Sequence, residues 1–344
     1  MGHRFTYVVS PEEERENLTV EWFLRRHGYS RHIITGLKRT EDGIFRNGVR
    51  AWTSQAVHAG DVIETHLVET EPSDGILPRP VPFSVVYEDD DILVVDKPAD
   101  TPIHPSIGNY ENTLANGIAW YFEQKGEPFV YRCINRLDRD TTGALILAKN
   151  PYSAAVLSAQ MKQRQIRRTY LAIVQGIAPE QGTIDAPIGR AADSTIERQV
   201  DFANGESAVT HYERLDTYHS YSLIELHLET GRTHQIRVHM EYIKHWCVGD
   251  PMYGTPGKAD NLGLTRQFLH SYFVEFEHPR TGEVMEFLAP VPKDLQDTLR
   301  KLQNRRIGLT DAGREVLFKY CSEGRGIQLP EGKTAEEVDS FTFL

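Results

Sequence analysis

The sequence has few cysteines and no long apolar run, and both shortages exclude classes of protein. Its three cysteines, Cys133, Cys247 and Cys321, stand far apart without a CxxC pair, which argues against a disulfide framework and a cysteine zinc site. The longest apolar run, GALILA at 143–148, is too short to span a bilayer, and the N-terminus has no apolar segment of signal-peptide length. We therefore expect a soluble cytoplasmic protein with reduced thiols and no membrane partner.

Several enzyme motifs are also missing. No GxGxxG follows an apolar strand, no GxxxxGK[ST] is present and no GxSxG occurs. These absences argue against a nucleotide cofactor and against a serine nucleophile on a strand-to-helix turn. We expect no cofactor.

The chain lacks the overall basic charge that is typical of nucleic-acid binders, with 38 bases, 49 acids and a net charge of −11. The bases are nevertheless clustered. Residues 15–50 hold eight bases against four acids, and residues 132–170 hold eight against two, whereas residues 69–100 hold two bases against nine acids. The acidic total therefore does not exclude RNA. It predicts binding on one positive face that weakens steeply with salt.

The length of 344 residues predicts about two domains. Residues 1–68 are expected to form a small α/β module, with two short helices, a hairpin at Asn47-Gly48 and a final strand. The proline- and acid-rich residues 69–82 predict a linker. Residues 83–302 show many strands, recurrent hairpins and scattered helices, which favours an α+β domain with a mixed, mostly antiparallel sheet. Residues 303–344 show little periodicity beyond VLFKY and are expected to form a C-terminal extension that is partly ordered at best.

The densest group of charged residues is CINRLDRDTTGALILAKN, at 133–150. Asp138 lies between Arg136 and Arg139, just before a turn that leads into an apolar strand. Neighbouring guanidinium groups should lower the pKa of Asp138, and an ionised carboxylate suits a nucleophile or an electrostatic stabiliser. The same pattern also fits an ion pair that only fixes a turn.

A second group lies in residues 228–254, after an alternating strand, LIELHLET, in which we expect one polar and one apolar face. Thr233 is expected to cap a helix whose first turns carry Arg232, His234 and Arg237. Helix N-termini attract anions, and arginines strengthen that attraction. The histidines at 234, 239 and 245 are spaced by five and six residues, which matches no zinc pattern, so we expect no metal.

A third group is QMKQRQIRRTYLAIV, in which four bases, Lys162, Arg164, Arg167 and Arg168, lead to Tyr170 without an intervening acid. A basic run beside an aromatic ring can hold phosphates and stack a base. A solvated helix end with cations in its last turn would give the same pattern.

Taken in order, these segments resemble the RluA-like family of pseudouridine synthases. The pairing of RLDRDTTG with GRTHQIR is highly specific, and the resemblance spans about residues 83–292. The first segment is similar to the RNA-binding module named after small-subunit ribosomal protein four, although its GLKRTEDGIFRNG loop is longer than the usual pattern. The matching stretches are YEDDDILVVDKPADTPIHPS, INRLDRDTTGALILAKN, RRTYLAIVQG, TGRTHQIRVHM, VGDPMYG and LHSYFVEFEHPRTGEVMEFLAP.

The resemblance implies an enzyme that breaks the glycosidic C–N bond of uridine in RNA, rotates the base and joins it again through carbon, without metal or cofactor. It makes Asp138 the catalytic aspartate, which either attacks the anomeric carbon or removes a ribose proton. Arg237 would keep Asp138 ionised, Tyr170 would stack on the base and Arg136 would fill the space left by the flipped nucleotide. Other implied RNA contacts are Asn135, where the family often has histidine, Thr142, where serine is usual, and Arg139, Arg167, Arg168, Arg232, His234 and Gln235.

Three functions fit these observations. The first is an RNA pseudouridine synthase acting as a monomer on large-subunit rRNA, with tRNA as the other candidate RNA. The second is a non-catalytic RNA-binding or ribosome-assembly protein on the same fold, against which the Asp138, Tyr170 and Arg237 set argues. The third is a glycosidase, which needs two carboxylates, and Asp138 has no second acid placed by a motif.

Overall fold

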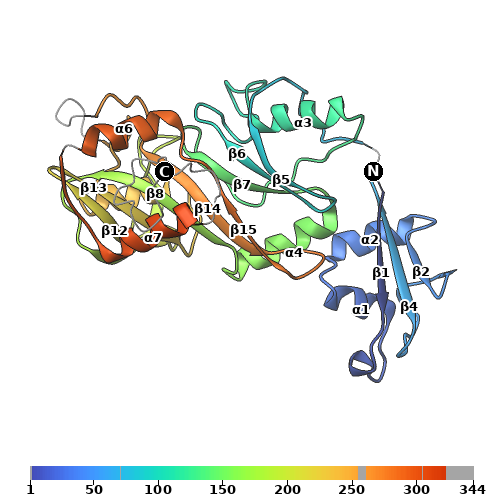
Figure 1. The fold of residues 1–344 in the computed structure, drawn as a ribbon. Coiled ribbons are helices and arrows are strands. Elements are labelled where there is room, and N and C mark those ends of the chain that lie inside the picture. The colour runs from blue at the N-terminus through green and yellow to red at the C-terminus, as the bar shows by residue number, and fades with distance from the viewer. Residues whose placement is uncertain (1, 70, 255–260, 304, 323–344) are drawn as a thin grey trace.

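The computed structural model describes residues 2–69, 71–254, 261–303 and 305–322, with the side chains of 317–322 left out. Figure 1 shows a small unit at the N-terminal end, residues 2–68, beside a longer body built on one large sheet, residues 84–322. We call these the N-terminal unit and the main body. Residues 71–83, which connect them, contain no helix or strand.

The N-terminal unit is a four-stranded antiparallel sheet with two α-helices and one short 3-10 helix. The expected hairpin at Asn47-Gly48 is present, whereas the first strand was not predicted. The strands in sheet order are β1 (Gly2–Val8), β4 (Val62–Val68), β2 (Ile44–Arg46) and β3 (Val49–Arg50), and the helices are η1 (Pro11–Glu13), α1 (Val20–Arg26) and α2 (Arg31–Arg39).

Local sequence explains both α-helices of this unit. The Thr19 and Ser30 hydroxyl oxygens each accept a hydrogen bond from a backbone N–H in the first turn of their helix, which satisfies a donor that the helix leaves unpaired. Apolar residues at helical spacing, such as Phe23 and Ile34, then pack on Phe5 of β1. The core of the unit is therefore closed by two short amphipathic helices.

The main body is built on a ten-stranded sheet of order β16-β12-β13-β8-β14-β7-β6-β5, with β15 paired to β14 and β9 paired to β12. Among the described strands only β14 and β7 run parallel, so the expectation of an α+β fold with a mostly antiparallel sheet is confirmed. The strands are β5 (Ser84–Glu88), β6 (Ile92–Lys97), β7 (Thr142–Ala148), β8 (Arg167–Gln175), β9 (Gln181–Asp185), β12 (Val209–Tyr218), β13 (Tyr221–Leu228), β14 (Leu269–Glu277), β15 (Val284–Leu288) and β16 (Arg306–Leu309), with a separate pair β10 (Ile188–Arg190) and β11 (Arg198–Val200).

Helices and loops cover both faces of this sheet. Leu93 and Val95 of β6 belong to a core with α3 and α5, whereas Ile92 and Val94 belong to a core with α4 on the other face. A strand covered on both faces carries a continuous apolar run, as β6 does at residues 92–95 and β7 at residues 144–148. The helices are α3 (Leu114–Gln124), α4 (Pro151–Lys162), α5 (Gln235–Tyr242), α6 (Lys293–Gln303) and α7 (Asp311–Ser322). No described helix combines the length and the apolar character that crossing a membrane requires.

Two-sided burial corrects one expectation. The alternation in LIELHLET predicted a polar outer face on β13, but Glu225 is only 7% exposed and accepts a hydrogen bond from the Tyr272 hydroxyl. Glu225 therefore faces neighbouring protein instead of water, whereas His227 on the same face is exposed. Alternation alone could not show this, because it reports the contrast between two faces and not what covers them.

Part of the C-terminal extension has regular structure, with a strand at residues 306–309 and a helix at residues 311–322. Strand β16 pairs with the outer strand β12, and the Thr310 hydroxyl accepts a hydrogen bond from the N–H of Gly313 in the first turn of α7. A Cβ on Gly313 would lie 2.2 Å from the Leu215 carbonyl oxygen, so glycine lets the helix approach the sheet. Residues 323–344 and the side chain of Cys321 lie outside the described residues, and Cys133 and Cys247 are free thiols.

Glu88 connects α3 to the edge of the sheet. Its carboxylate accepts hydrogen bonds from the Tyr121 hydroxyl at 2.6 Å, from Lys125 Nζ at 2.8 Å and from Lys149 Nζ at 2.8 Å. Burial alone would raise the pKa of Glu88, but these donors lower it to about 2. The ionised form is thus strongly favoured in the folded protein.

Replacing Glu88 should cost stability in a pH-dependent way. The folded pKa lies below the ordinary value of 4.5, so the stabilisation is complete above pH 4.5 and is lost as the pH falls towards 2. We expect Glu88→Gln to lower the free energy of unfolding at pH 7 by at most about 3 kcal/mol, measured by urea denaturation at several pH values. Glu111→Gln, in an exposed pair with Arg79, is the control and should change little. A loss that is the same at pH 7 and pH 3 would contradict the assignment.

Candidate active site

One pocket collects charged and aromatic side chains from three distant segments of the main body. The loop before β7, the strand β8 and the turn before α5 each contribute to its wall. The lining residues are Arg136, Leu137, Asp138, Thr141, Arg168, Tyr170, Leu228, Gly231, Arg232, His234, Gln235, Ile236, Arg237 and Leu269.

Asp138 lies on a short turn that the backbone holds in place. The N–H of Thr141 donates to the Asp138 carbonyl oxygen at 3.1 Å, which closes the turn. The buried Lys97 donates to the carbonyl of Arg139 at 2.8 Å and to that of Thr101 at 2.9 Å, and so joins this turn to the loop after β6. The Asp138 carboxylate is 16% exposed and faces Arg237.

Arg237 is held between two carboxylates. Its Nε and Nη2 donate to the two oxygens of Asp250 at 2.7 and 2.9 Å, and its Nη1 donates to Asp138 at 3.2 Å. Burial would lower the pKa of Arg237, but Asp250 and Asp138 raise it, so the guanidinium is permanently charged. The bidentate pair with Asp250 fixes the plane of the guanidinium and directs its remaining N–H groups at Asp138.

The carboxylate of Asp250 is held by the backbone of the residues that follow it. One of its oxygens accepts backbone N–H groups from Met252 at 2.9 Å and Tyr253 at 3.1 Å. The preceding Gly249 has a φ of +78°, and a Cβ there would lie 2.2 Å from the Arg266 carbonyl oxygen. Only glycine fits at that place. The Tyr253 ring lies 4.9 Å from the Arg237 guanidinium carbon, which adds a cation–π contact.

Tyr170 stands near the middle of β8 and is 4% exposed. Burial raises its pKa, so the phenol stays protonated at neutral pH. Arg168, two residues earlier, points to the same face of the strand because side chains alternate. Arg168 is 7% exposed, and within the described chain its Nε has no hydrogen-bond partner. A buried donor without an acceptor in the pocket wall is suited to a ligand.

The turn before α5 differs from the expectation. His234, and not Thr233, immediately precedes the helix, and it has a φ of 58° with no side-chain cap. The Gln235 side chain instead accepts the N–H of Arg232 at 2.9 Å and donates to the Val209 carbonyl at 3.0 Å, which ties the turn to β12. His234 Nδ1 lies 2.9 Å from the Tyr253 hydroxyl, and burial lowers the pKa of His234.

Four residues expected at the site lie outside this pocket. Asn135 is buried, and its amide pairs with the backbone of β7 at Ile146, at 2.8 Å. The Thr142 hydroxyl is 2.8 Å from His270 Nδ1, also buried. Arg139 pairs with Asp100 on the surface, and Arg167 pairs with Glu275 on the opposite face of β8 from Tyr170. Alternation along β8 explains why Arg167 and Arg168 face different sides.

Sequence reasoning missed Asp250 and Tyr253 as site residues. Both belong to the stretch VGDPMYG, but no pattern in that stretch pairs its acid with an arginine thirteen residues earlier. The histidines at 234, 239 and 245 have separate partners, which are Tyr253, Thr210 with Ala186, and Gln175.

Comparisons with known proteins show which proteins this chain is similar to. A family profile described as RNA pseudouridylate synthase matches residues 91–242. The chain is 37% identical over 284 residues to the uncharacterized RNA pseudouridine synthase YjbO of Bacillus subtilis, covering 82% of this chain and 99% of that protein. It is 36% identical over 284 residues to ribosomal large subunit pseudouridine synthase D of Neisseria meningitidis serogroup A, covering 80% and 75%. The solved structure of human RNA pseudouridylate synthase domain containing 1 matches with a TM-score of 0.56 and 25% identity, covering 75% of this chain and 99% of that one.

The buried carboxylate of Asp250 should contribute strongly to stability. Asp250→Asn leaves the Arg237 cation with Asp138 as its one ionic partner, and we expect a loss of about 3 kcal/mol in the free energy of unfolding, measured by urea denaturation. Asp297→Asn is the matched control, because Asp297 pairs with Lys293 and Arg300 on the exposed face of α6. The control should lose less than about 1 kcal/mol. Equal losses in the two variants would show that Asp250 holds Arg237 only weakly.

Proposed function

This chain belongs to the RNA pseudouridine synthase family, and from that premise we propose that it isomerises specific uridines in large-subunit rRNA through Asp138. The observation that carries the proposal is the arrangement in which Asp250 fixes Arg237 and Arg237 contacts Asp138 at the pocket wall. The rRNA assignment is supported by relatives that are named ribosomal large subunit pseudouridine synthase D.

The reaction needs an ionised carboxylate beside the ribose. The bond from uracil N1 to the anomeric carbon breaks, a bond from uracil C5 to that carbon forms, and the proton lost at C5 is balanced by one gained at N1. Asp138 starts this sequence either by attacking the anomeric carbon or by removing the neighbouring ribose proton. Arg237 serves both routes, because a permanent cation 3.2 Å from the Asp138 carboxylate stabilises negative charge on it.

The remaining pocket residues suit a flipped base. A uridine stacked in RNA hides its glycosidic bond, so it must leave the stack to reach Asp138. The protonated Tyr170 ring offers a surface for that base, and the unpartnered Nε of Arg168 offers a donor to its carbonyl or to a phosphate. The exposed Arg136 at the pocket margin is proposed to fill the space that the base leaves.

The N-terminal unit is proposed to be an RNA-binding module similar to that of small-subunit ribosomal protein four. A shallow depression on this unit is lined by Trp22, Trp52, Arg25 and Lys38, among others. Trp52 is 57% exposed, and the Arg50 guanidinium carbon lies 5.1 Å from its ring. Exposed indole rings between cations can stack bases while the cations contact phosphates.

Each part of the chain has its own proposed role. Residues 1–68 would bind RNA, 69–82 would link the two parts and 83–302 would carry the catalytic pocket. We propose that one chain acts alone in the cytoplasm, since one chain carries both the pocket and the RNA-binding surface. An aspartate that forms and breaks bonds to carbon needs no metal or organic cofactor.

Asp138→Asn should abolish pseudouridine formation and leave RNA binding intact. An amide can neither attack the anomeric carbon nor remove a proton, so we expect the rate to fall at least about 10³-fold. Carbodiimide labelling of pseudouridine followed by primer extension measures the product, and filter binding measures affinity. Asp140→Asn is the matched control, because its carboxylate accepts the Asp100 N–H and does not line the pocket. Full activity in Asp138→Asn would overturn the mechanism.

The same labelling applied to total RNA identifies the target. Cells lacking the gene should lose a modification in large-subunit rRNA, which the wild type restores and Asp138→Asn does not. A loss confined to tRNA would overturn the rRNA assignment. A protein that restores no site would favour a non-catalytic RNA-binding role.

Trp52→Ala should weaken RNA binding without changing the pocket. Losing one stacked base costs about 1–3 kcal/mol, which is a fall in affinity of about fivefold or more. Trp120→Ala is the control, since Trp120 is a partly exposed indole on α3 of the main body. Equal affinity in Trp52→Ala and the wild type would remove this tryptophan from the interface.

A further inference from the structure

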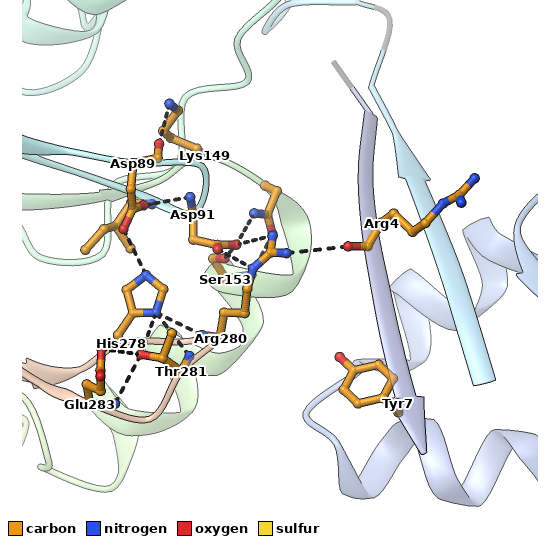
Figure 2. Close-up of polar contacts among 12 residues, drawn as sticks. Arg4, Tyr7, Asp89, Asp91, Lys149, Ser153, His278, Arg280, Thr281 and Glu283 are labelled. Carbon is orange, nitrogen blue, oxygen red and sulfur yellow. Dashed lines mark hydrogen bonds and ion pairs between the residues drawn. The ribbon is translucent and has the colours of Figure 1, made fainter. Parts of the chain in front are cut away.

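The N-terminal unit is packed directly against the main body. Figure 2 shows the polar part of this junction, where the turn between β14 and β15, the turn before β6 and the start of α4 face β1. These segments are far apart in sequence. Neither the pocket nor the proposed RNA-binding depression uses the residues that meet here.

Arg280 contacts both parts at once. Its guanidinium donates to Asp91 of the main body, from Nε at 2.5 Å and from Nη2 at 3.2 Å. Its Nη1 donates to the backbone carbonyl of Arg4 in β1 at 3.4 Å, and its central carbon lies 4.3 Å from the Phe5 ring. One side chain therefore joins a carboxylate of the main body to the first strand of the N-terminal unit (Figure 2).

The surroundings of Asp91 fix its carboxylate in a position to pair with Arg280. Its side chain is 3% exposed, and it also accepts hydrogen bonds from Asn150 Nδ2 at 2.8 Å and Ser153 Oγ at 2.9 Å. Burial would raise the pKa of Asp91, but Arg280, Asn150 and Ser153 lower it below its ordinary value. The carboxylate is thus a fixed anion, and Arg280 has one bidentate geometry available.

The turn that carries Arg280 is fixed as well. His278 Nδ1 lies 3.3 Å from the Arg280 N–H and 3.1 Å from the Thr281 N–H, so this nitrogen is the acceptor. His278 Nε2 then donates to Asp89 at 3.0 Å. Asp89, Asp91 and His278 stand close enough to suggest a cation site, but the Arg280 guanidinium already occupies Asp91, and His278 already donates to Asp89. The cluster holds an arginine.

An apolar contact extends the junction. Tyr152 of α4 lies within the core of the N-terminal unit, with its ring 4.6 Å from that of Phe5 and 4.9 Å from that of Tyr29. Gly28 packs on the same helix, and a Cβ there would lie 3.0 Å from Val156. The N-terminal unit thus shares part of its core with the main body instead of hanging on residues 71–83.

We propose that Arg280 is a positioning residue that locks the N-terminal unit in one orientation on the main body, so that the enzyme prefers RNAs whose two contact regions have one matching separation. This inference rests on the proposed RNA-binding role of the N-terminal unit. When the two sites are held rigidly, binding of one RNA to both does not cost the conformational entropy of a flexible connection. RNAs that reach both sites therefore bind with higher affinity.

Two RNAs test the proposal. A short stem-loop with the target uridine reaches only the pocket, whereas a longer rRNA fragment also reaches the N-terminal unit. In Arg280→Met we expect the KM for the long RNA to rise about tenfold, with kcat unchanged and with both constants for the stem-loop unchanged. Arg280→Lys, which keeps a cation opposite Asp91, should show a smaller rise. Arg300→Met on the exposed face of α6 is the control and should match the wild type.

A second measurement does not depend on activity. Small-angle X-ray scattering should give a larger radius of gyration for Arg280→Met than for the wild type and for Arg300→Met, and Arg280→Gln, which also removes the cation, takes its place if the methionine variant does not fold. An unchanged radius of gyration would overturn the proposal that Arg280 fixes the orientation of the N-terminal unit. An equal KM rise for the two RNAs would also overturn it, because a general loss of stability would act on both. A wild type that forms no pseudouridine would instead refute the proposed function, while the scattering result would still test the lock.

Discussion

The candidate site depends on a chain of charges in which two carboxylates share one guanidinium. The side chain of Asp250 has no exposed surface, and it is paired with an arginine whose side chain is 6% exposed. Removing charge from water at this depth is costly unless every partner is in place. The turn at Gly249, the start of α5 and the turn at Asp138 must therefore all be in position together. The site is correctly formed only when the three segments that carry it have packed.

The two-sided sheet provides that packing. Strand β8 places Tyr170 and Arg168 on the pocket face, while Arg167 faces the other side, where Glu275 meets it. Two side chains of the pocket wall thus come from a strand whose interior residues, 168–174, are all buried. Residues with perturbed surroundings, such as the buried phenol of Tyr170, stand on a rigid support, which is what a reaction requiring close alignment needs.

Short sequence patterns predicted many of the helices, strands and turns of this structure. Contacts between segments that are distant in the sequence could not be predicted in the same way. The hairpin at Asn47-Gly48, the two short helices of the N-terminal unit and the strongly apolar strand β7 follow from short patterns, and these are present. The family motifs singled out Asp138, Tyr170 and Arg237, and all three line one pocket in the structure. Their roles in the reaction stay predictions. Asp250, the docking of Tyr152 and the true start of α5 were not visible, because each depends on a partner from a distant segment. Asn135 and Thr142 were predicted to contact RNA because they belong to a family motif. In the structure the Asn135 side chain accepts a hydrogen bond from the backbone N–H of Ile146, and the Thr142 hydroxyl is hydrogen-bonded to His270.

Strand β16 has a consequence for the order in which the molecule can be completed. It pairs with β12 at one border of the ten-stranded sheet, and residues 306–309 follow all the other strands of that sheet along the chain. During synthesis, this part of β12 remains an open border with unpaired N–H and C=O groups until those last residues emerge. Open borders of this kind recruit strands from other chains. Once β16 has paired, the border passes from β12 to a strand of only four residues, and short border strands offer few groups to another chain.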